Sequence, residues 1–157
     1  MTTRAELEAA VESGDVNRVL SLTTVEDIAD AWWRATARWT PGESAGEQDM
    51  TSDPDWWALE FWVGGAPVYD DQAIVQLGLV ALADRAPQGS EVSHLGAGPL
   101  ENYVNDDDDR LSWLEQQAQR SVFFQKALGT IWCDDLTEAS IRRLERAAGT
   151  ALARAKR

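Results

Sequence analysis

Apolar residues recur along most of the chain at the spacing of three or four positions that places side chains on one side of a helix. The clearest stripe consists of Val25, Ile28, Trp32, Ala35 and Trp39. A second stripe, near the C-terminus, consists of Ile141, Leu144, Ala148 and Ala151. Alternating runs of β-branched residues, which would predict strands, are scarce. The pattern therefore predicts an all-α fold.

Capping residues and helix breakers divide this apolar pattern into short helices. Residues that favour a helix N-cap precede most of the stripes, namely Thr3, Asp15, Thr24, Asp53, Ser121 and Thr137. Pro54 and Pro99 each favour the first position of a helix, and Gly14 and Gly129 favour helix ends. The result is about nine helices, which we expect to pack as a compact bundle or as a short, solenoid-like array of helical hairpins.

The length and composition are those of one globular domain. The chain has 157 residues, of which 44% are hydrophobic and 26% are charged. This composition excludes intrinsic disorder, and no internal repeat of fixed period is visible. We therefore expect a single helical domain over residues 1–157.

Acidic residues dominate the charge. They outnumber basic residues by 27 to 14, which gives a formal net charge of −13. Residues 1–109 hold 22 acids and 5 bases, whereas residues 110–157 hold 5 acids and 9 bases. The sign argues against direct binding to nucleic acid, because phosphate contacts need Lys and Arg. It favours a basic protein partner, although a purely solubilising surface would have the same composition.

Two sequence features bear on location. The N-terminus lacks a basic stretch followed by an apolar one, so no secretory signal peptide is predicted. The longest apolar run, Ala73–Ala83, is too short to cross a bilayer. We therefore expect a cytoplasmic protein that does not bind membranes, in which Cys133 stays unpaired.

Histidine and cysteine offer little material for a metal or cofactor site. His94 and Cys133 occur once each, which excludes a zinc site built from several histidines or from cysteines. No nucleophile elbow, HExxH motif or Ser-His-Asp order is present. We expect no cofactor, no metal and no catalytic residue, so the sequence favours a protein that is not an enzyme.

The stretch Leu95–Glu101 reads LGAGPLE. It resembles the core of a family of bacterial proteins of unknown function. Two other stretches are also similar, Ile28–Trp32 to the family's opening helix and Ala127–Gly129 with Ile131–Trp132 to the segment before its last helix. The resemblance covers residues 25–148 and implies a helical, bacterial protein to which no activity is attached.

Two interpretations of the LGAGPLE turn remain open. Gly96 and Gly98 allow a positive φ or a close approach of the backbone, and Pro99 begins a helix. Backbone N–H groups at a helix start can bind an anion, which makes His94, Gly96, Gly98 and Glu101 a candidate ligand turn. The alternative is a tight connection between helices, in which Glu101 interacts with the N–H groups of the first helical turn.

Eight tryptophans are an unusual number for a chain of 157 residues. Four of them lie where the apolar stripes predict a core, namely Trp32, Trp39, Trp57 and Trp132. Trp33, Trp56 and Trp62 lie off the stripes, so some of them can be exposed, and exposed tryptophan often anchors a protein interface. Exposure of the whole Trp56–Val63 segment would favour a homodimer.

Glu60 is the one carboxylate within the apolar segment Trp56–Val63. Such a carboxyl group can have a raised pKa, as a general acid requires. Together with His94 it supports an alternative function, a small helical enzyme or ligand-binding domain with a site near these two residues. Otherwise Glu60 points to solvent or pairs with an arginine.

Asp106, Asp107, Asp108 and Asp109 form an acidic run that lacks the glycine and distal glutamate of a calcium loop. The run can cap the helix that begins near Arg110, or it can contact a basic protein. These four residues, together with Trp33, Trp56 and Trp62, are the predicted partner-binding residues.

The missing catalytic motifs, the acidic charge and the tryptophans together predict a non-catalytic protein–protein interaction module. Its concrete form would be an acidic inhibitor or immunity-type protein that neutralises a basic toxin or nuclease. Acidic complementarity would speed association, and tryptophan anchors would supply affinity.

Overall fold

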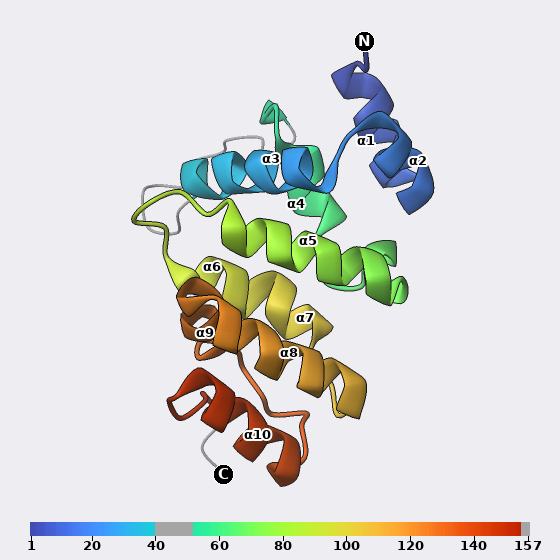
Figure 1. Cartoon of the computed structure of the whole chain (residues 1–157). Helices are drawn as coiled ribbons and strands as arrows, with labels where there is room; N and C mark the ends of the chain where they lie inside the picture. The colour runs from blue at the N-terminus through green and yellow to red at the C-terminus, as the bar shows by residue number, and fades with distance from the viewer. Residues whose placement is uncertain (40–51, 155–157) are drawn as a thin grey trace. The chain divides into compact units, whose positions relative to one another are not determined.

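The computed structural model describes residues 1–39 and 52–154, which fall into two compact units. Unit 1 is Met1–Gln88 and unit 2 is Gly89–Arg157. Unit 1 contains α1 (Arg4–Glu12), α2 (Val16–Leu22), α3 (Val25–Arg38), α4 (Trp56–Phe61), the short 3-10 helix η2 (Pro67–Asp70) and α5 (Gln72–Asp84) (Figure 1). Unit 2 contains α6 (Val92–Leu95), the π-type turn η3 (Gly96–Leu100), α7 (Glu101–Tyr103), α8 (Asp108–Arg120), α9 (Val122–Leu128) and α10 (Glu138–Ala148).

The predicted all-α fold is confirmed. The described residues form helices and contain no strand, only an isolated bridge between Trp132 and Ala153. No helix within the described residues is both long and apolar enough to cross a membrane. That the chain is a single domain stays a prediction.

Side-chain caps begin most of these helices at the residues that the sequence indicates. Thr3 and Glu6 form the predicted capping box of α1, and Thr24 accepts a hydrogen bond from the Asp27 N–H at the start of α3. The N-caps of α2, α9 and α10 are Asp15, Ser121 and Thr137. Each cap satisfies a backbone N–H that the helix itself leaves without a partner, which fixes where the helix begins.

The core of unit 1 forms where α3 packs against α4 and α5, and Figure 1 shows α3 and α5 side by side. Trp33 on α3 is 3% exposed, and its indole N–H donates to the Leu82 carbonyl on α5 over 2.7 Å. Gly78 on α5 leaves room for the Trp62 ring, since a Cβ at this position would lie 2.4 Å from that ring. The helices of unit 1 are therefore joined largely through tryptophan.

The start of α4 differs from the sequence prediction. Asp53 with Pro54 was expected to open this helix, but α4 begins at Trp56 and its N-cap residue, Asp55, makes no side-chain cap hydrogen bond. The Asp53 carboxylate accepts the backbone N–H of Asp55, which lies just before α4, and it also binds Arg38 and Trp39 at the end of α3. Two charge-assisted hydrogen bonds to a guanidinium outweigh a single cap, which explains the difference.

Unit 2 is built around three mutually packed helices, α8, α9 and α10, with α6 and η3 against α9. Its most deeply buried side chains are Leu95, Leu100, Tyr103, Leu111, Leu114, Phe124, Leu128, Ile131 and Leu144. Trp113 lies edge-on to both Tyr103 and Phe124, at ring-centroid distances of 5.6 and 5.8 Å. These contacts leave one side of α8 and α10 lining the open pocket described below.

Candidate functional site

The tryptophans predicted to reach a partner are largely buried. Trp33 and Trp62 are each 3% exposed, so the expectation that they contribute to a partner surface is wrong. Trp33 lies on α3, which is contacted by both α4 and α5, and the Trp62 ring packs at Gly78 of α5; a single helical stripe reveals neither contact. Trp56 is half-buried, and Val63 is the exposed large apolar residue of the segment Trp56–Val63. That segment is mostly core, which removes the reason to expect a homodimer through it.

Glu60 and His94 lie in different units, so neither unit by itself brings them together. Glu60 accepts a hydrogen bond from the Trp56 indole N–H over 2.9 Å, one helical turn away. The cavity beside it has a volume of only about 20 Å³, roughly the space of one water molecule. This environment offers a substrate no room, and it gives no support to an enzyme at Glu60.

The LGAGPLE turn is a tight packing contact, one of the two alternatives that the sequence left open. A Cβ on Gly96 would lie 1.8 Å from the Thr130 hydroxyl oxygen and 2.1 Å from the Ala127 carbonyl oxygen, so η3 sits directly on α9. Gly98 has φ −133° and ψ −107°, which breaks the helical path before Pro99. Neither glycine has a positive φ, and the close approach applies to Gly96 alone, because a Cβ on Gly98 would meet nothing within 4 Å.

The sequence favoured an interaction of Glu101 with the N–H groups of the first turn of its own helix. The structure gives Glu101 a different partner. Its Oε2 accepts the backbone N–H of Trp132 over 2.8 Å, across 31 positions of sequence. The side chain thus fastens the loop after α9 to α7. Such a long-range partner is not visible in local sequence patterns.

Most of the acidic run Asp106–Asp109 is engaged within unit 2. Asp106 accepts from the backbone N–H and the hydroxyl of Thr137 at 3.0 and 2.9 Å. Hydrogen bonds from Ser140 and Thr137 also hold the pKa of Asp106 below its ordinary value. Asp107 caps α8, which confirms the capping interpretation, and Asp108 pairs with Arg143 at 2.8 Å. Asp109 is exposed, and of the four it is the best placed for a partner.

The large exposed aromatic residue of unit 2 is Trp132, which the sequence assigned to the core. It is 49% exposed, whereas its neighbours Ile131 and Cys133 are 0% and 1% exposed. Segment 131–133 follows α9 as extended chain rather than as helix, and alternate side chains of extended chain point to opposite sides. The helical stripe was therefore the wrong pattern for this residue.

Trp132 is held in place from two directions. Glu101 accepts its backbone N–H, and Asp134 accepts its indole N–H. The backbone N–H of Cys133 donates to the Ala153 carbonyl over 3.3 Å, which ties the same segment to the residues after α10. We call Glu101, Trp132, Asp134 and Asp135 the Trp132 surface. It presents an exposed aromatic ring held by Asp134, with Glu101 on the backbone N–H of Trp132 and the exposed Asp135 three positions later in the sequence.

Unit 1 holds a cluster of charges that sequence reasoning missed, formed by Arg34, Arg38, Asp53 and Asp55. Arg38 binds Asp53 through two hydrogen bonds of 2.7 Å each, and Arg34 binds Asp55 at 3.0 and 2.8 Å. Arg38 also reaches Asp55 over 2.5 Å. Arg34 and Arg38 stand one turn apart on α3, a spacing that could have suggested a shared pair of carboxylates.

The aspartates of this Arg–Asp cluster are the buried partners. Asp53 and Asp55 are each 7% exposed, and the indole N–H of Trp39 donates to Asp53 over 2.9 Å. Hydrogen bonds from Arg38 lower the pKa of Asp53 to about 2. Burial acts to raise the pKa of Asp55, but hydrogen bonds from Arg34 and Arg38 together hold it below its ordinary value. With these partners the cluster fastens α4 to α3 and offers little to a substrate.

The Arg–Asp cluster predicts a loss of stability in acid. Because the pKa of Asp53 is lowered on folding, its contribution is present above about pH 4 and is lost as the pH falls toward 2. We expect a loss of about 2 kcal/mol in the free energy of unfolding over that interval. Urea unfolding of the protein and of Asp53→Asn, at several pH values, measures it. The variant should be less stable at neutral pH and should lose less stability in acid; equal slopes would contradict the assignment.

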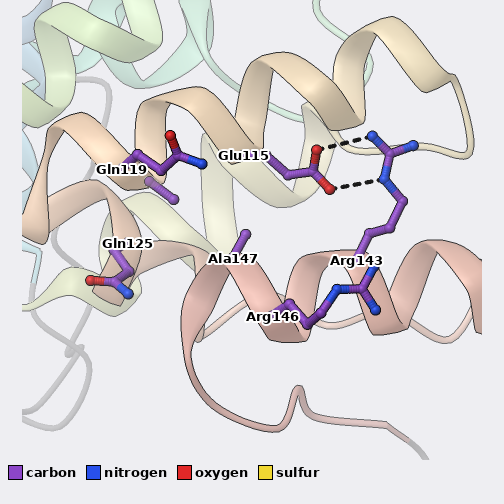
Figure 2. Close-up of a pocket in the computed structure, with 7 residues that line it drawn as sticks. Glu115, Gln119, Gln125, Arg143, Arg146 and Ala147 are labelled. Atoms are coloured by element: carbon purple, nitrogen blue, oxygen red, sulfur yellow. Dashed lines mark hydrogen bonds and ion pairs between the residues drawn. The ribbon is translucent and has the colours of Figure 1, made fainter.

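An open pocket in unit 2 has a volume of about 540 Å³ and lies among α8, α9 and α10. Its lining includes Glu115, Gln119, Gln125, Arg143, Arg146 and Ala147. Figure 2 shows Glu115 and Gln119 on α8 facing Ala147 and Arg146 on α10, with Gln125 at one end. The sequence analysis did not identify this site, since its residues come from three helices and form no motif.

Within this pocket the two arginines differ in their partners. Arg143 forms two hydrogen bonds with Glu115, at 2.9 and 3.0 Å, and further ones with Asp108 and Ser112. Hydrogen bonds from Arg143 hold the pKa of Glu115 below its ordinary value. Arg146 forms no ion pair with any residue in the described part of the chain. The pocket therefore presents one guanidinium that is available to a ligand.

The sequence pattern of a family described as a family of unknown function, DUF6869, matches residues 45–152. The chain belongs to this family. No curated protein and no solved structure matches it.

Membership of DUF6869 agrees with the resemblance to a family of unknown function and brings no activity with it. The matched residues include the Trp132 surface and the pocket of unit 2. They also include Asp53 and Asp55, whereas α1, α2 and α3 lie before the first matched residue. Three or more His, Cys, Asp or Glu side chains do not gather as a metal site anywhere in the described residues.

Proposed function

We propose that the protein is a non-catalytic interaction module that binds a basic protein partner, as an acidic inhibitor or immunity-type protein of the bacterial cytoplasm would. The observation that carries the proposal is Trp132, which is 49% exposed and held by Glu101 and Asp134. A tryptophan fixed before binding loses little conformational freedom when a partner covers it, and tryptophan is enriched among the residues that dominate binding energy.

The chemistry around Trp132 favours a cationic partner. Glu101 binds the backbone N–H of Trp132 and Asp134 binds its indole, so both add negative charge at this surface, and the exposed Asp135 follows three positions later. The face of an indole itself attracts Lys and Arg. A basic side chain of the partner can therefore lie over the ring while carboxylates pair with its neighbours. This is the complementarity that an acidic inhibitor needs toward the positive site of a nuclease or toxin.

Charge in unit 1 supports the same class of partner. Residues 1–88 contain 16 acids and 5 bases. Arg4, Arg34, Arg38 and Arg85 each form an ion pair inside the unit, so their charges are already committed. The excess carboxylates leave a negative field that would accelerate encounter with a basic protein and weaken as salt rises.

A buried, unpaired cysteine is consistent with the cytoplasmic part of the proposal. Cys133 is free and buried, and burial raises the pKa of its thiol. A thiol of that kind is unreactive and persists in a reducing compartment.

Trp132→Ala is expected to weaken binding of the basic partner at least about tenfold, because it removes the aromatic anchor. Asp135→Lys should slow association and flatten its salt dependence, since Asp135 is an exposed carboxylate three positions after Trp132. Wild-type and variant chains would serve as parallel baits in host lysate at low salt, followed by titration with the captured protein once purified. Asp134 is unsuitable for substitution because it holds the indole.

Val122→Ala is the matched control. Val122 is 66% exposed on α9 of the same unit but lies outside the Trp132 surface. A partner that binds wild type and Val122→Ala alike, releases with salt and is lost on Trp132→Ala supports the proposal. If Trp132→Ala bound the partner as tightly as wild type and had the same melting temperature, the proposal would be wrong.

A further inference from the structure

The pocket of unit 2 contains three polar side chains that bind no other residue of the described chain and are free to bind a ligand in place of water. Within the described residues, Gln119, Gln125 and Arg146 have no side-chain hydrogen bond or ion pair. They come from α8, α9 and α10 and line the same space of about 540 Å³. Convergence of unsatisfied donors from three helices is what a small polar ligand requires for orientation.

The charged residues that line the pocket indicate which net charge a ligand would have. Glu115 neutralises Arg143, and Asp108 adds a further carboxylate at the outer side of that arginine. Arg146 forms no ion pair in the described lining, and although its charge also acts on Glu115, the two arginines and one glutamate of the lining leave an excess of one positive charge. One uncommitted guanidinium beside fixed carboxylates favours a singly charged anion over a doubly charged phosphate.

The remaining lining indicates the shape of the ligand. Ala118 and Ala147 supply methyl groups between the polar residues, which leaves room for a short aliphatic body. Gln119 and Gln125 each offer an N–H donor and a carbonyl acceptor, a combination that pairs well with an amide group. Figure 2 shows Ala147 between the Gln119 and Arg146 side chains, so apolar and polar groups line the same pocket.

We propose that this pocket binds a small monocarboxylate that carries an amide, such as an N-acylated amino acid. Arg146 receives the carboxylate through its planar pair of N–H donors, and Gln119 and Gln125 bind the amide. Ala118 and Ala147 contact the aliphatic body. This ligand site is independent of the Trp132 surface, so either proposal can fail without the other.

Titration of the full-length, 15N-labelled protein with N-acetylalanine, followed by NMR, tests the proposal. We expect saturable shifts of the Gln119 and Gln125 side-chain amide signals. Arg146→Gln should weaken binding at least about tenfold, because it removes the charge-assisted pair. Arg142→Gln is the matched control, since Arg142 is an exposed arginine of α10 that does not line the pocket.

Two further probes decide the chemistry of the ligand. N-acetylalaninamide has a neutral carboxamide in place of the carboxylate of N-acetylalanine, and inorganic phosphate supplies an anion without an amide. Binding of N-acetylalanine that is lost in Arg146→Gln and retained in Arg142→Gln supports the proposal. Absence of saturable shifts at low-millimolar concentration, equal binding by either further probe, or an unchanged affinity in Arg146→Gln would overturn it.

Discussion

Gly96→Ala is expected to lower the free energy of unfolding of unit 2 by about 3 kcal/mol, at the upper end of what overpacking costs. A Cβ at this position would lie 1.8 Å from the Thr130 hydroxyl oxygen and 2.1 Å from the Ala127 carbonyl oxygen. The first neighbour can rotate away, but the second belongs to the backbone of α9 and cannot. The whole η3 turn would have to move outward. Thermal and urea unfolding measure the effect.

Ala97→Ser is a suitable control for Gly96→Ala. Ala97 is the next residue and is exposed, so the substitution adds one heavy atom without entering the contact with α9. We expect its stability to stay within about 0.5 kcal/mol of wild type. If Gly96→Ala were as stable as Ala97→Ser, the close contact between η3 and α9 would be wrong.

Arg38→Gln is expected to cost about 2–3 kcal/mol in the free energy of unfolding. The substitution leaves Asp53, and in part Asp55, buried without their shared guanidinium. Arg34 still binds Asp55, but Asp53 keeps only the Trp39 indole and the Asp55 backbone N–H. A buried carboxylate with too few donors must either remain charged at high cost or take up a proton.

Arg4→Gln is the matched control for Arg38→Gln. Arg4 also pairs with a carboxylate, Glu8, but that pair is exposed and spans one helical turn. Exposed pairs of this kind contribute about 0.3–0.5 kcal/mol. Chemical denaturation of both variants at neutral pH separates the two cases, and a loss in Arg38→Gln no larger than in Arg4→Gln would show that the Arg–Asp cluster does not stabilise unit 1.

Local signals in the sequence were sufficient to predict most of the helices, although not α6 (Val92–Leu95) or η2 (Pro67–Asp70). Thr3, Ser121 and Thr137 each satisfy a backbone N–H three residues ahead, so the cap and the helix start are encoded within one turn. Asp53 has the same local signature, yet its carboxylate binds Arg38, which is 15 positions earlier. A capping interaction can be inferred from the local sequence only when no residue distant in the sequence binds the capping side chain more strongly.

The candidate sites depended on contacts that a single sequence does not contain. Trp33 and Trp62 were misplaced because their burial comes from α5, and Trp132 because its segment is extended rather than helical. The pocket at Arg146 was missed since its chemistry depends on Glu115 having already paired with Arg143, a contact over 28 positions. Which charged side chains remain available to a ligand can be known only when the folded structure shows which of them form ion pairs with each other.

The position of α3 has a consequence for dissecting the protein. The residues matched by DUF6869 start at 45, after Arg34 and Arg38, but they contain the two aspartates that these arginines neutralise. A polypeptide trimmed to residues 45–152 would therefore contain Asp53 and Asp55 without the two arginines that pair with them. Recombinant fragments of unit 1 should begin before α1, and other family members can be inspected for a preceding helix that carries two arginines one turn apart.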